Sequence, residues 1–144
     1  MLNLTELEKA YLAGLFDGEG SIGYYNSKPY LTITNTDARI FNWIKQRISI
    51  GIIKTRSRVG SLGKKPTWEW SVRNKLQVVL VLEAIRPYLI IKVDQVDLLL
   101  SLWDAEKLAR CGKNRKVPEH IIQQRQVTEA GLKRMKTTIT QSIH

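Results

Sequence analysis

The feature that most constrains what this chain can fold into is the nine-residue stretch from Leu12 to Gly20, which reads Leu-Ala-Gly-Leu-Phe-Asp-Gly-Glu-Gly. Upstream of it, Thr5 and Glu8 have the spacing of a capping box, which predicts that a helix begins at Thr5. Glycine costs a soluble helix about 1 kcal/mol relative to alanine, so two glycines within one short helix require a structural reason.

This helix is expected to have two packing surfaces. One is an apolar stripe that would face the core of the protein: Leu4, Leu7, Tyr11 and Leu15. The other consists of small residues that recur every four positions, a spacing that lets two helix backbones approach closely: Ala10, Gly14 and Gly18, with Ala13 beside them. The pattern therefore predicts one surface for the protein's own core and one for a second helix.

Asp17 and Glu19 lie at the expected C-terminal end of the helix, where free carbonyl groups and the helix dipole already concentrate negative charge. A carboxylate at that end is poorly placed for stability and well placed to bind a hard cation. The simpler interpretation is a helix with a glycine C-cap that leads into a hairpin, its acidic side chains merely solvated.

The charge of the chain is concentrated in two blocks. The net charge is +10 over 144 residues, and 43% of the residues are hydrophobic, which is typical of a folded domain. Residues 54–75 carry a net charge of +6 and residues 107–144 a net charge of +7. We expect one domain over residues 1–144, with a core of about 1–108, a basic C-terminal tail over 109–144, and a polyanionic partner.

The single cysteine, Cys111, excludes a disulfide within the chain and favours an intracellular, reducing compartment. The pattern does not distinguish cytoplasm or nucleoid from an organelle matrix. No apolar run reaches membrane-spanning length, so no membrane partner is expected. The two histidines, His120 and His144, lack the spacing of metal ligands, which disfavours a zinc site.

Hydrophobic periodicity and turn residues predict an α+β fold in the order α-β-β-α-β-β-α-α, a four-stranded antiparallel sheet with helices packed on one face. After the first helix, the expected elements are strands at 21–25 and 30–36, a helix from Asp37 to about Ile48, and strands at 54–58 and 68–73. Then come helices from Asn74 to Ile85, where Pro87 ends the helix, and from Val93 to Leu108, followed by two weaker helical stretches at 119–126 and 129–139.

The second hairpin alternates strictly, so one of its faces is expected to be buried and the other wet. Arginine outnumbers lysine on the wet face, which favours bidentate recognition of guanine or phosphate over a plain solvated face. The residues of this face are Lys54, Arg56, Arg58, Glu69, Ser71 and Arg73, with Lys64 and Lys65 in the connecting loop. Further predicted DNA contacts come from the first hairpin and from a basic loop: Tyr25, Ser27, Lys28, Tyr30, Thr32, Thr34, Lys113, Arg115 and Lys116.

The stretch from Leu12 to Gly20 closely resembles the signature of the LAGLIDADG homing endonucleases, single-motif type, although Phe16 and Gly18 depart from the residues of the family name. The resemblance extends over roughly the first 108 residues and implies the same element order, with a saddle-shaped sheet that binds DNA. It implies that the signature helix packs against its twin, and that the acid in the eighth position, Glu19, binds the catalytic metal with the carbonyl group of Gly18. Here that acid is Glu where the family name has Asp.

The segment from Pro87 to Lys92 looks like the second marker of the same family, whose lysine lies by the active site. The resemblance thus implies that Lys92 is catalytic. Asn35 and Arg39 are looser matches to residues that lie near the scissile phosphate.

The resemblance implies a homodimeric, site-specific endonuclease that cuts a long, pseudo-palindromic double-stranded DNA target with Mg²⁺ or Mn²⁺ as cofactor. The expected dimer interface consists of Ala10, Ala13, Gly14, Asp17 and Gly18. Two alternatives remain open at this point: a maturase that binds intron RNA, and a catalytically silent DNA-binding regulator of the same fold. Glu19 together with Lys92 disfavours both, since a pure binder needs neither residue.

Overall fold

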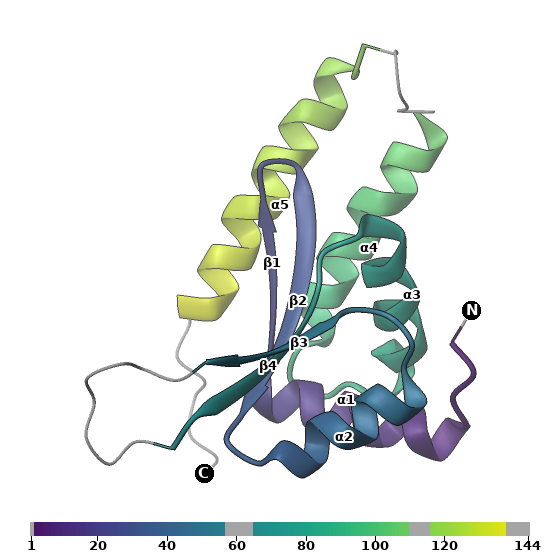
Figure 1. Cartoon of the computed structure of the whole chain (residues 1–144). Coiled ribbons are helices and arrows are strands. Elements are labelled where there is room, and N and C mark those ends of the chain that lie inside the picture. The colour runs from purple at the N-terminus through teal and green to yellow at the C-terminus, as the bar shows by residue number, and fades with distance from the viewer. Residues whose placement is uncertain (1, 57–64, 110–115, 138–144) are drawn as a thin grey trace, which may run out of the picture.

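The computed structural model describes residues 2–56, 65–109 and 116–137. It has the predicted α+β architecture, in which helices pack on a four-stranded antiparallel sheet (Figure 1). The elements are α1 (Glu6–Glu19), β1 (Gly20–Tyr25), β2 (Lys28–Asn35), α2 (Ala38–Arg47), β3 (Ile52–Arg56), β4 (Thr67–Val72), α3 (Lys75–Ile85), a 3-10 turn (Arg86–Tyr88), α4 (Val93–Leu108) and α5 (Glu119–Thr137).

Side-chain caps fix where the first three helices begin. The hydroxyl of Thr5 accepts a hydrogen bond from the backbone N–H of Glu8 at 3.2 Å, and the carboxylate of Glu8 accepts one from the N–H of Thr5 at 3.1 Å. Asp37 and Asn74 cap α2 and α3 in the same general way. Each cap pairs donors that the first turn of a helix leaves unsatisfied, so these three predicted starts are confirmed.

The sheet has the strand order β1-β2-β4-β3, and all neighbours are antiparallel. β1 and β2 are joined by Asn26 and Ser27, whose φ values of 50° and 60° are those of a tight two-residue hairpin turn. The register places Leu31 opposite both Ile22 and Val72, and Ile33 opposite Trp70. These side chains are buried, so one face of the sheet forms the core against the helices and the other face is open.

The core-facing side of α1 differs from the predicted stripe. The buried residues of the helix are Leu12, Ala13 and Phe16, and Leu4 is buried just before it, whereas Leu7 is 85% exposed and Tyr11 52% exposed. The helix has apolar residues on two sides, so periodicity alone does not identify the core side. The stripe through Leu7 and Tyr11 was therefore assigned to the wrong face.

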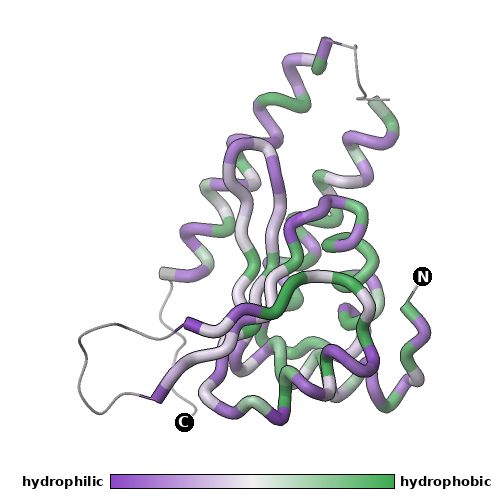
Figure 2. The backbone as a smooth tube through the Cα atoms, in the orientation of Figure 1, coloured by the Kyte–Doolittle hydropathy of each residue, from purple (hydrophilic) through white to green (hydrophobic). Residues whose placement is uncertain are grey.

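The C-terminal segment contains one continuous helix where two weak stretches were expected. α5 packs along α4 and beside the edge strand β1 (Figure 1), and it buries Ile121 and Leu132 completely or nearly so. It is mostly hydrophilic in Figure 2, in contrast to α3, which explains its weak sequence pattern. Within the described residues, no helix is both long enough and apolar enough to cross a membrane.

Candidate active site and nucleic-acid interface

The C-terminal end of α1 presents the exposed side chain of Glu19 directly before strand β1. The N–H of Gly20 donates to the carbonyl oxygen of Phe16 and closes the last helical turn. A side chain on Gly20 would collide with the ring of Phe16, because an added Cβ would lie 2.3 Å from that ring. In the part of the chain that the structure describes, no hydrogen bond or ion pair engages the carboxylate of Glu19, which is therefore free to take a ligand.

The side chain of Lys92 is hydrogen-bonded to the same helix end. Its ammonium group donates a hydrogen bond of 2.7 Å to the backbone carbonyl oxygen of Asp17, two residues before Glu19. A cation at the C-terminal end of a helix is favoured by the helix dipole and pairs a carbonyl that the helix leaves open. The structure thus brings the predicted lysine and the predicted acid to one helix end, although they are 73 positions apart in the sequence.

Asp17 holds the loop that carries Lys92. Its carboxylate accepts three backbone N–H groups, from Ile90 at 2.8 Å, Ile91 at 3.2 Å and Lys92 at 2.9 Å. Hydrogen bonds to an ionised acceptor are stronger than neutral ones, and here one side chain fixes three consecutive residues. Asp17 was predicted as a dimer contact, but its carboxylate is engaged inside the protomer and serves to position Lys92.

Asn35 and Arg39 are held in a local turn at the start of α2. The side-chain oxygen of Asn35 accepts the N–H of Asp37 at 2.9 Å. The guanidinium of Arg39 forms an ion pair of 2.6 Å with Asp37, and this pairing lowers the pKa of the Asp37 carboxyl to about 2. Continuing the β1–β2 register beyond Gly20 places the backbone of Asn35 beside the end of α1.

The side chain of Arg39 points elsewhere. It is 90% exposed and lines a groove of about 540 Å³ with Leu7, Tyr11 and Trp43. The structure therefore does not bring Arg39 together with Glu19.

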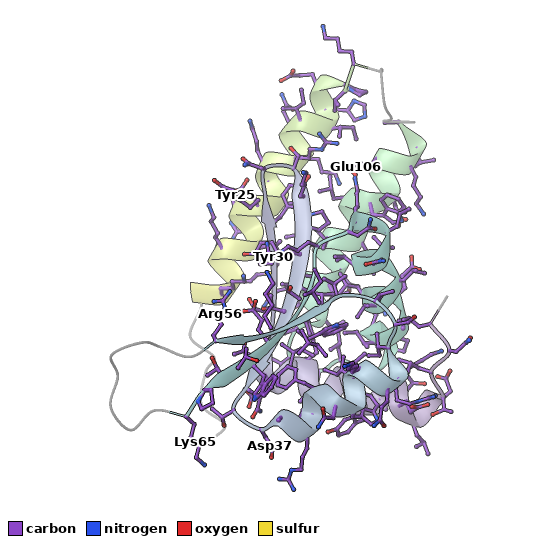
Figure 3. All side chains as sticks on the ribbon, viewed as in Figure 1. Tyr25, Tyr30, Asp37, Arg56, Lys65 and Glu106 are labelled. Carbon is purple, nitrogen blue, oxygen red and sulfur yellow. The ribbon has the colours of Figure 1, made fainter. Side chains whose placement is uncertain are left out.

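The open face of the sheet presents most of the residues expected to contact DNA. In Figure 3, Tyr25, Tyr30, Arg56 and Lys65 follow one another from the tip of the first hairpin towards β3 and β4. Thr32 and Ser71 lie opposite each other in the register, as do Thr34 and Glu69, and Glu69 and Lys54. The face thus carries rows of polar and basic side chains across the strands, as strict alternation predicted.

Two contacts preorganise the arginines of this face. The guanidinium of Arg56 forms an ion pair of 3.2 Å with Glu69, and that of Arg73 lies 5.5 Å from the ring centroid of Tyr30. The ring of Tyr30 lies across Gly23, where an added Cβ would come within 2.2 Å of it. A hollow of about 620 Å³ beside these residues is lined by Tyr25, Lys28, Thr32, Arg73 and, from α5, Lys133.

The residues predicted to contact DNA differ in their exposure. Ser71 is covered by its neighbours and only 7% exposed, so its hydroxyl offers little to a ligand. Ser27, Lys28, Lys54, Lys65 and Lys116 are exposed. Arg58, Lys64, Lys113 and Arg115 lie outside the described residues.

The outer face of α1 is apolar and contains the two glycines. Leu7, Ala10, Tyr11, Gly14 and Gly18 share this face, and an added Cβ at either glycine would have no neighbour within 4 Å. Packing within the protomer therefore does not account for the glycines. Ala13, which was predicted beside them in the dimer interface, is 0% exposed and belongs to the protomer's core instead.

The donor set at the end of α1 fits a hard divalent cation with few protein ligands. Among the described residues, no group of three or more His, Cys, Asp or Glu side chains comes together. Glu19 and the backbone carbonyl groups at the helix end offer oxygen ligands, and Mg²⁺ commonly takes one or two carboxylates and keeps several waters.

The fold is thus an α+β domain whose antiparallel sheet has an open, basic face and an acidic helix end at its border. Residues 6–91 match the sequence profile of the family described as "LAGLIDADG-like domain". This chain belongs to that family, and its fold is that of the homing endonucleases with a single signature motif.

Solved structures support the same fold. The homing endonuclease I-CvuI, in complex with the I-CreI target in the presence of Mg, superimposes with a TM-score of 0.68 at 18% sequence identity, over 96% of this chain and 87% of that chain. The archaeal intron-encoded homing endonuclease I-Vdi141I, in complex with DNA, gives a TM-score of 0.65 at 15% identity, over 96% and 90%. No curated protein sequence matches this chain at a significant level.

Proposed function

We propose that this protein is a homodimeric DNA endonuclease of the homing type, which uses Mg²⁺ or Mn²⁺ to cut both strands of a long, pseudo-palindromic target. The observation that carries the proposal is the end of α1, where the free carboxylate of Glu19 and the ammonium group of Lys92 meet beside an exposed apolar helix face. The unpaired carboxylate can bind a metal ion, and the nearby ammonium group can stabilise negative charge on a phosphate. Hydrolysis of a phosphodiester bond needs both.

The outer face of α1 supports the dimer. A parallel twin packed on Gly14 and Gly18 would bring two copies of Glu19 to the two-fold axis, so that each protomer contributes to one composite centre. One Glu19 alone is too little for a site that must act on both strands. Ile90 and Ile91, which Asp17 binds through their N–H groups, are exposed apolar residues that border the same helix end.

The residues at this centre have distinct roles. A divalent cation bound by Glu19 and the carbonyl group of Gly18 would supply Lewis-acid activation of water and charge neutralisation. Lys92 would donate hydrogen bonds to the attacking water or to a phosphate oxygen and stabilise the charge that develops on it. Asp17 holds Lys92 in place, and Asn35 lies at the border of the site. For Arg39 the geometry supports a place in the groove beside Tyr11 rather than at the reacting phosphate.

The open sheet supports recognition of double-stranded DNA in the major groove, which admits a two-stranded ribbon. Arg56 and Arg73 would read base edges, and the exposed lysines would bind phosphates. The I-CvuI and I-Vdi141I structures were both solved in complex with DNA, which agrees with this assignment. Intron RNA as a partner stays an alternative, which an RNA-binding assay with the host intron would test.

The test is incubation of the purified protein with a library of DNA duplexes, including the intron-less allele of the host locus, in Mg²⁺, in Mn²⁺ and in EDTA. We expect cleavage that requires a divalent cation and yields double-strand breaks at one site. Glu19→Gln keeps the size of the side chain but removes its charge, so it should abolish cleavage while DNA binding in Ca²⁺ is retained.

Two outcomes would contradict the proposal. Cutting by the Glu19→Gln protein at the parental rate would remove Glu19 from the mechanism. Tight, specific DNA or RNA binding by a parent protein that never cuts would favour the regulator or the maturase.

A further inference from the structure

Lys136, near the end of α5, reaches the turn that carries Glu19. Its ammonium group donates a hydrogen bond of 3.3 Å to the hydroxyl of Ser21, two residues after Glu19, although the two partners are 115 positions apart in the sequence. Lys92 binds the carbonyl oxygen of Asp17, two residues before Glu19. The two lysines therefore bracket the five-residue turn from Asp17 to Ser21.

The strand register shows which side of the sheet Lys136 approaches. Ser21 lies opposite Thr32, and Thr32 lies opposite Ser71, so the three hydroxyls form one row on the open face. β1 is the edge strand of the sheet, and α5 runs beside it (Figure 1). Lys133, one turn earlier on α5, lines the hollow of the open face with Tyr30 and Arg73. The C-terminal half of α5 thus forms a basic wall along the proposed DNA-binding face.

Two ammonium groups are held at this turn by hydrogen bonds to uncharged oxygens, the carbonyl oxygen of Asp17 and the hydroxyl of Ser21. Burial, and then the positive charge of Lys92, lower the pKa of Lys136, which agrees with the binding of both lysines to one turn. Among the described residues, neither lysine is paired with a carboxylate. Like charges at short range are unfavourable in the free protein and become favourable when an anion lies between them. An arrangement of this kind is suited to a phosphate group.

We propose that Lys136 is a phosphate-binding residue of the active site, which contacts a non-bridging oxygen of the scissile phosphate from the α5 side while Lys92 contacts it from the other. The inference rests on the proposed nuclease function and adds to it a residue that lies outside both sequence motifs. It also assigns α5 a role in the reaction, since the helix carries the second cation to the centre.

The experiment uses the duplex that the cleavage selection returns and measures single-turnover cutting at saturating protein. Lys136→Met should slow the cutting step by about 100- to 1,000-fold, the range expected for the loss of one preorganised donor to a developing charge. Lys136→Arg, which keeps the charge, should retain most of the rate. Lys107→Met removes the same charge from the outer surface of α4, where Lys107 pairs with Asp104, and it should cut at the parental rate.

A second measurement locates the contact. Binding in Ca²⁺ is compared for the natural duplex and for one whose scissile phosphate is a neutral methylphosphonate. The parent should lose affinity on the modified duplex, and Lys136→Met should lose less, because the contact from Lys136 is already absent and only that from Lys92 and the bound cation remains to be weakened. Thermal melting of each variant checks that α5 stays folded.

The outcomes separate the two proposals. If the parent cuts and Lys136→Met cuts at the same saturated rate, the inference is wrong and the nuclease function stands. An equal loss in Lys107→Met would reduce the effect to net charge and overturn the inference in the same way. If the parent cuts no duplex in any divalent cation, the proposed function fails, and the assignment of Lys136 fails with it.

Discussion

At the scale of single residues, Asp17 gives the sharpest contrast between what a motif suggests and what a side chain does. From the sequence it was an acid at the end of the signature helix and an expected residue of the dimer interface. In the structure its carboxylate accepts three backbone N–H groups from the loop before α4. The partners lie 73 to 75 positions away, so no local pattern could have indicated them.

Asp17→Asn is therefore expected to damage both stability and catalysis. An amide presents one acceptor oxygen and one donor group, and the donor would face an N–H of the loop. The free energy of unfolding should fall by about 1–3 kcal/mol, the cost of an unsatisfied polar group. Cutting should slow because Lys92 is displaced. Urea denaturation and single-turnover cleavage measure the two effects.

Glu19→Gln is the matched control for Asp17→Asn, since it removes a charge from the same turn without removing a structural hydrogen bond. It should abolish cutting and leave metal-free stability unchanged or higher. An Asp17→Asn protein with parental stability and rate would show that the clamp on the loop is unimportant.

Arg56 is expected to contact the edges of DNA bases. Its ion pair with Glu69 holds the guanidinium on the open face, where it is 64% exposed and able to take a base edge. Arg56→Ala should weaken target binding by about 1–3 kcal/mol and relax preference at particular base positions, because a bidentate contact to guanine discriminates between bases. Binding selections with randomised duplexes would show which positions relax.

Lys116→Ala serves as the comparison for Arg56→Ala. Lys116 is exposed, lies outside the sheet and was predicted to contact phosphate. Loss of Lys116 should weaken binding to all DNA sequences equally. It should also reduce the slope of log binding constant against log salt concentration by about one, because one fewer counterion is released. If Arg56→Ala behaves in the same uniform way, Arg56 is a phosphate contact and not a base reader.

At the scale of elements, the sequence predicted what local chemistry determines. The capping residues Thr5, Asp37 and Asn74 act within three positions, and the starts of α1, α2 and α3 followed from them. The alternation in the second hairpin predicted which face of β4 is open, apart from the covered Ser71. These features were predictable because the interactions that cause them join residues that are close together in the sequence.

What the sequence did not predict depends on contacts between distant segments. α1 is apolar on two sides, so only the packed fold shows that Leu12 and Phe16 face the core while Leu7 does not. α5 buries few side chains over nineteen residues, which leaves almost no periodicity to detect. Its contact with Ser21 through Lys136 is likewise invisible in the sequence.

The docking of α5 depends on a buried acid. Glu106 of α4, labelled in Figure 3, is 3% exposed and pairs with Lys75 of α3 and, at 2.8 Å, with Arg125 of α5. Glu106→Gln should lower the free energy of unfolding by about 2–3 kcal/mol, because it removes the charge that compensates two cations, one of them largely buried. Hydrogen exchange should increase first in α5.

The same variant links the element to the site. If α5 detaches from α4, Lys136 is no longer held at Ser21. The rate of cutting should then fall as the fraction of molecules with α5 detached rises. Glu83→Gln, on the exposed side of α3, neutralises an acid without disturbing this network and should change neither quantity. Equal protection of α5 in Glu106→Gln and in the parent would show that apolar contacts alone hold the helix.

At the scale of the whole molecule, the two basic blocks of the sequence converge on one side. The first block forms β3, β4 and their connection, and the second includes α5, whose Lys133 and Lys136 border the open face. Positive charge gathered on one surface raises the rate and affinity of DNA binding and makes both sensitive to salt. The exposed apolar face of α1 has no such explanation within one protomer.

Gly14→Leu tests whether that face belongs to a dimer. In the protomer the substitution is tolerated, because Gly14 is exposed and an added Cβ has no neighbour within 4 Å. Leucine also favours a helix over glycine by nearly 1 kcal/mol, so the protomer should melt at an unchanged or higher temperature. In a helix pair packed on Gly14, the same side chain would force the backbones apart. Sedimentation at micromolar concentration should therefore show a dimeric parent and a monomeric variant.

The control is Ser101→Leu, which adds the same side chain to an exposed position on α4, away from the outer face of α1. It should remain a dimer and cut DNA normally. The Gly14→Leu monomer should nick or ignore the duplex that the parent breaks, since each half of the pseudo-palindrome would meet one Glu19 without its twin. A parent that sediments as a monomer, or a Gly14→Leu protein that still dimerises and cuts both strands, would exclude the outer face of α1 as the interface and with it the composite active site.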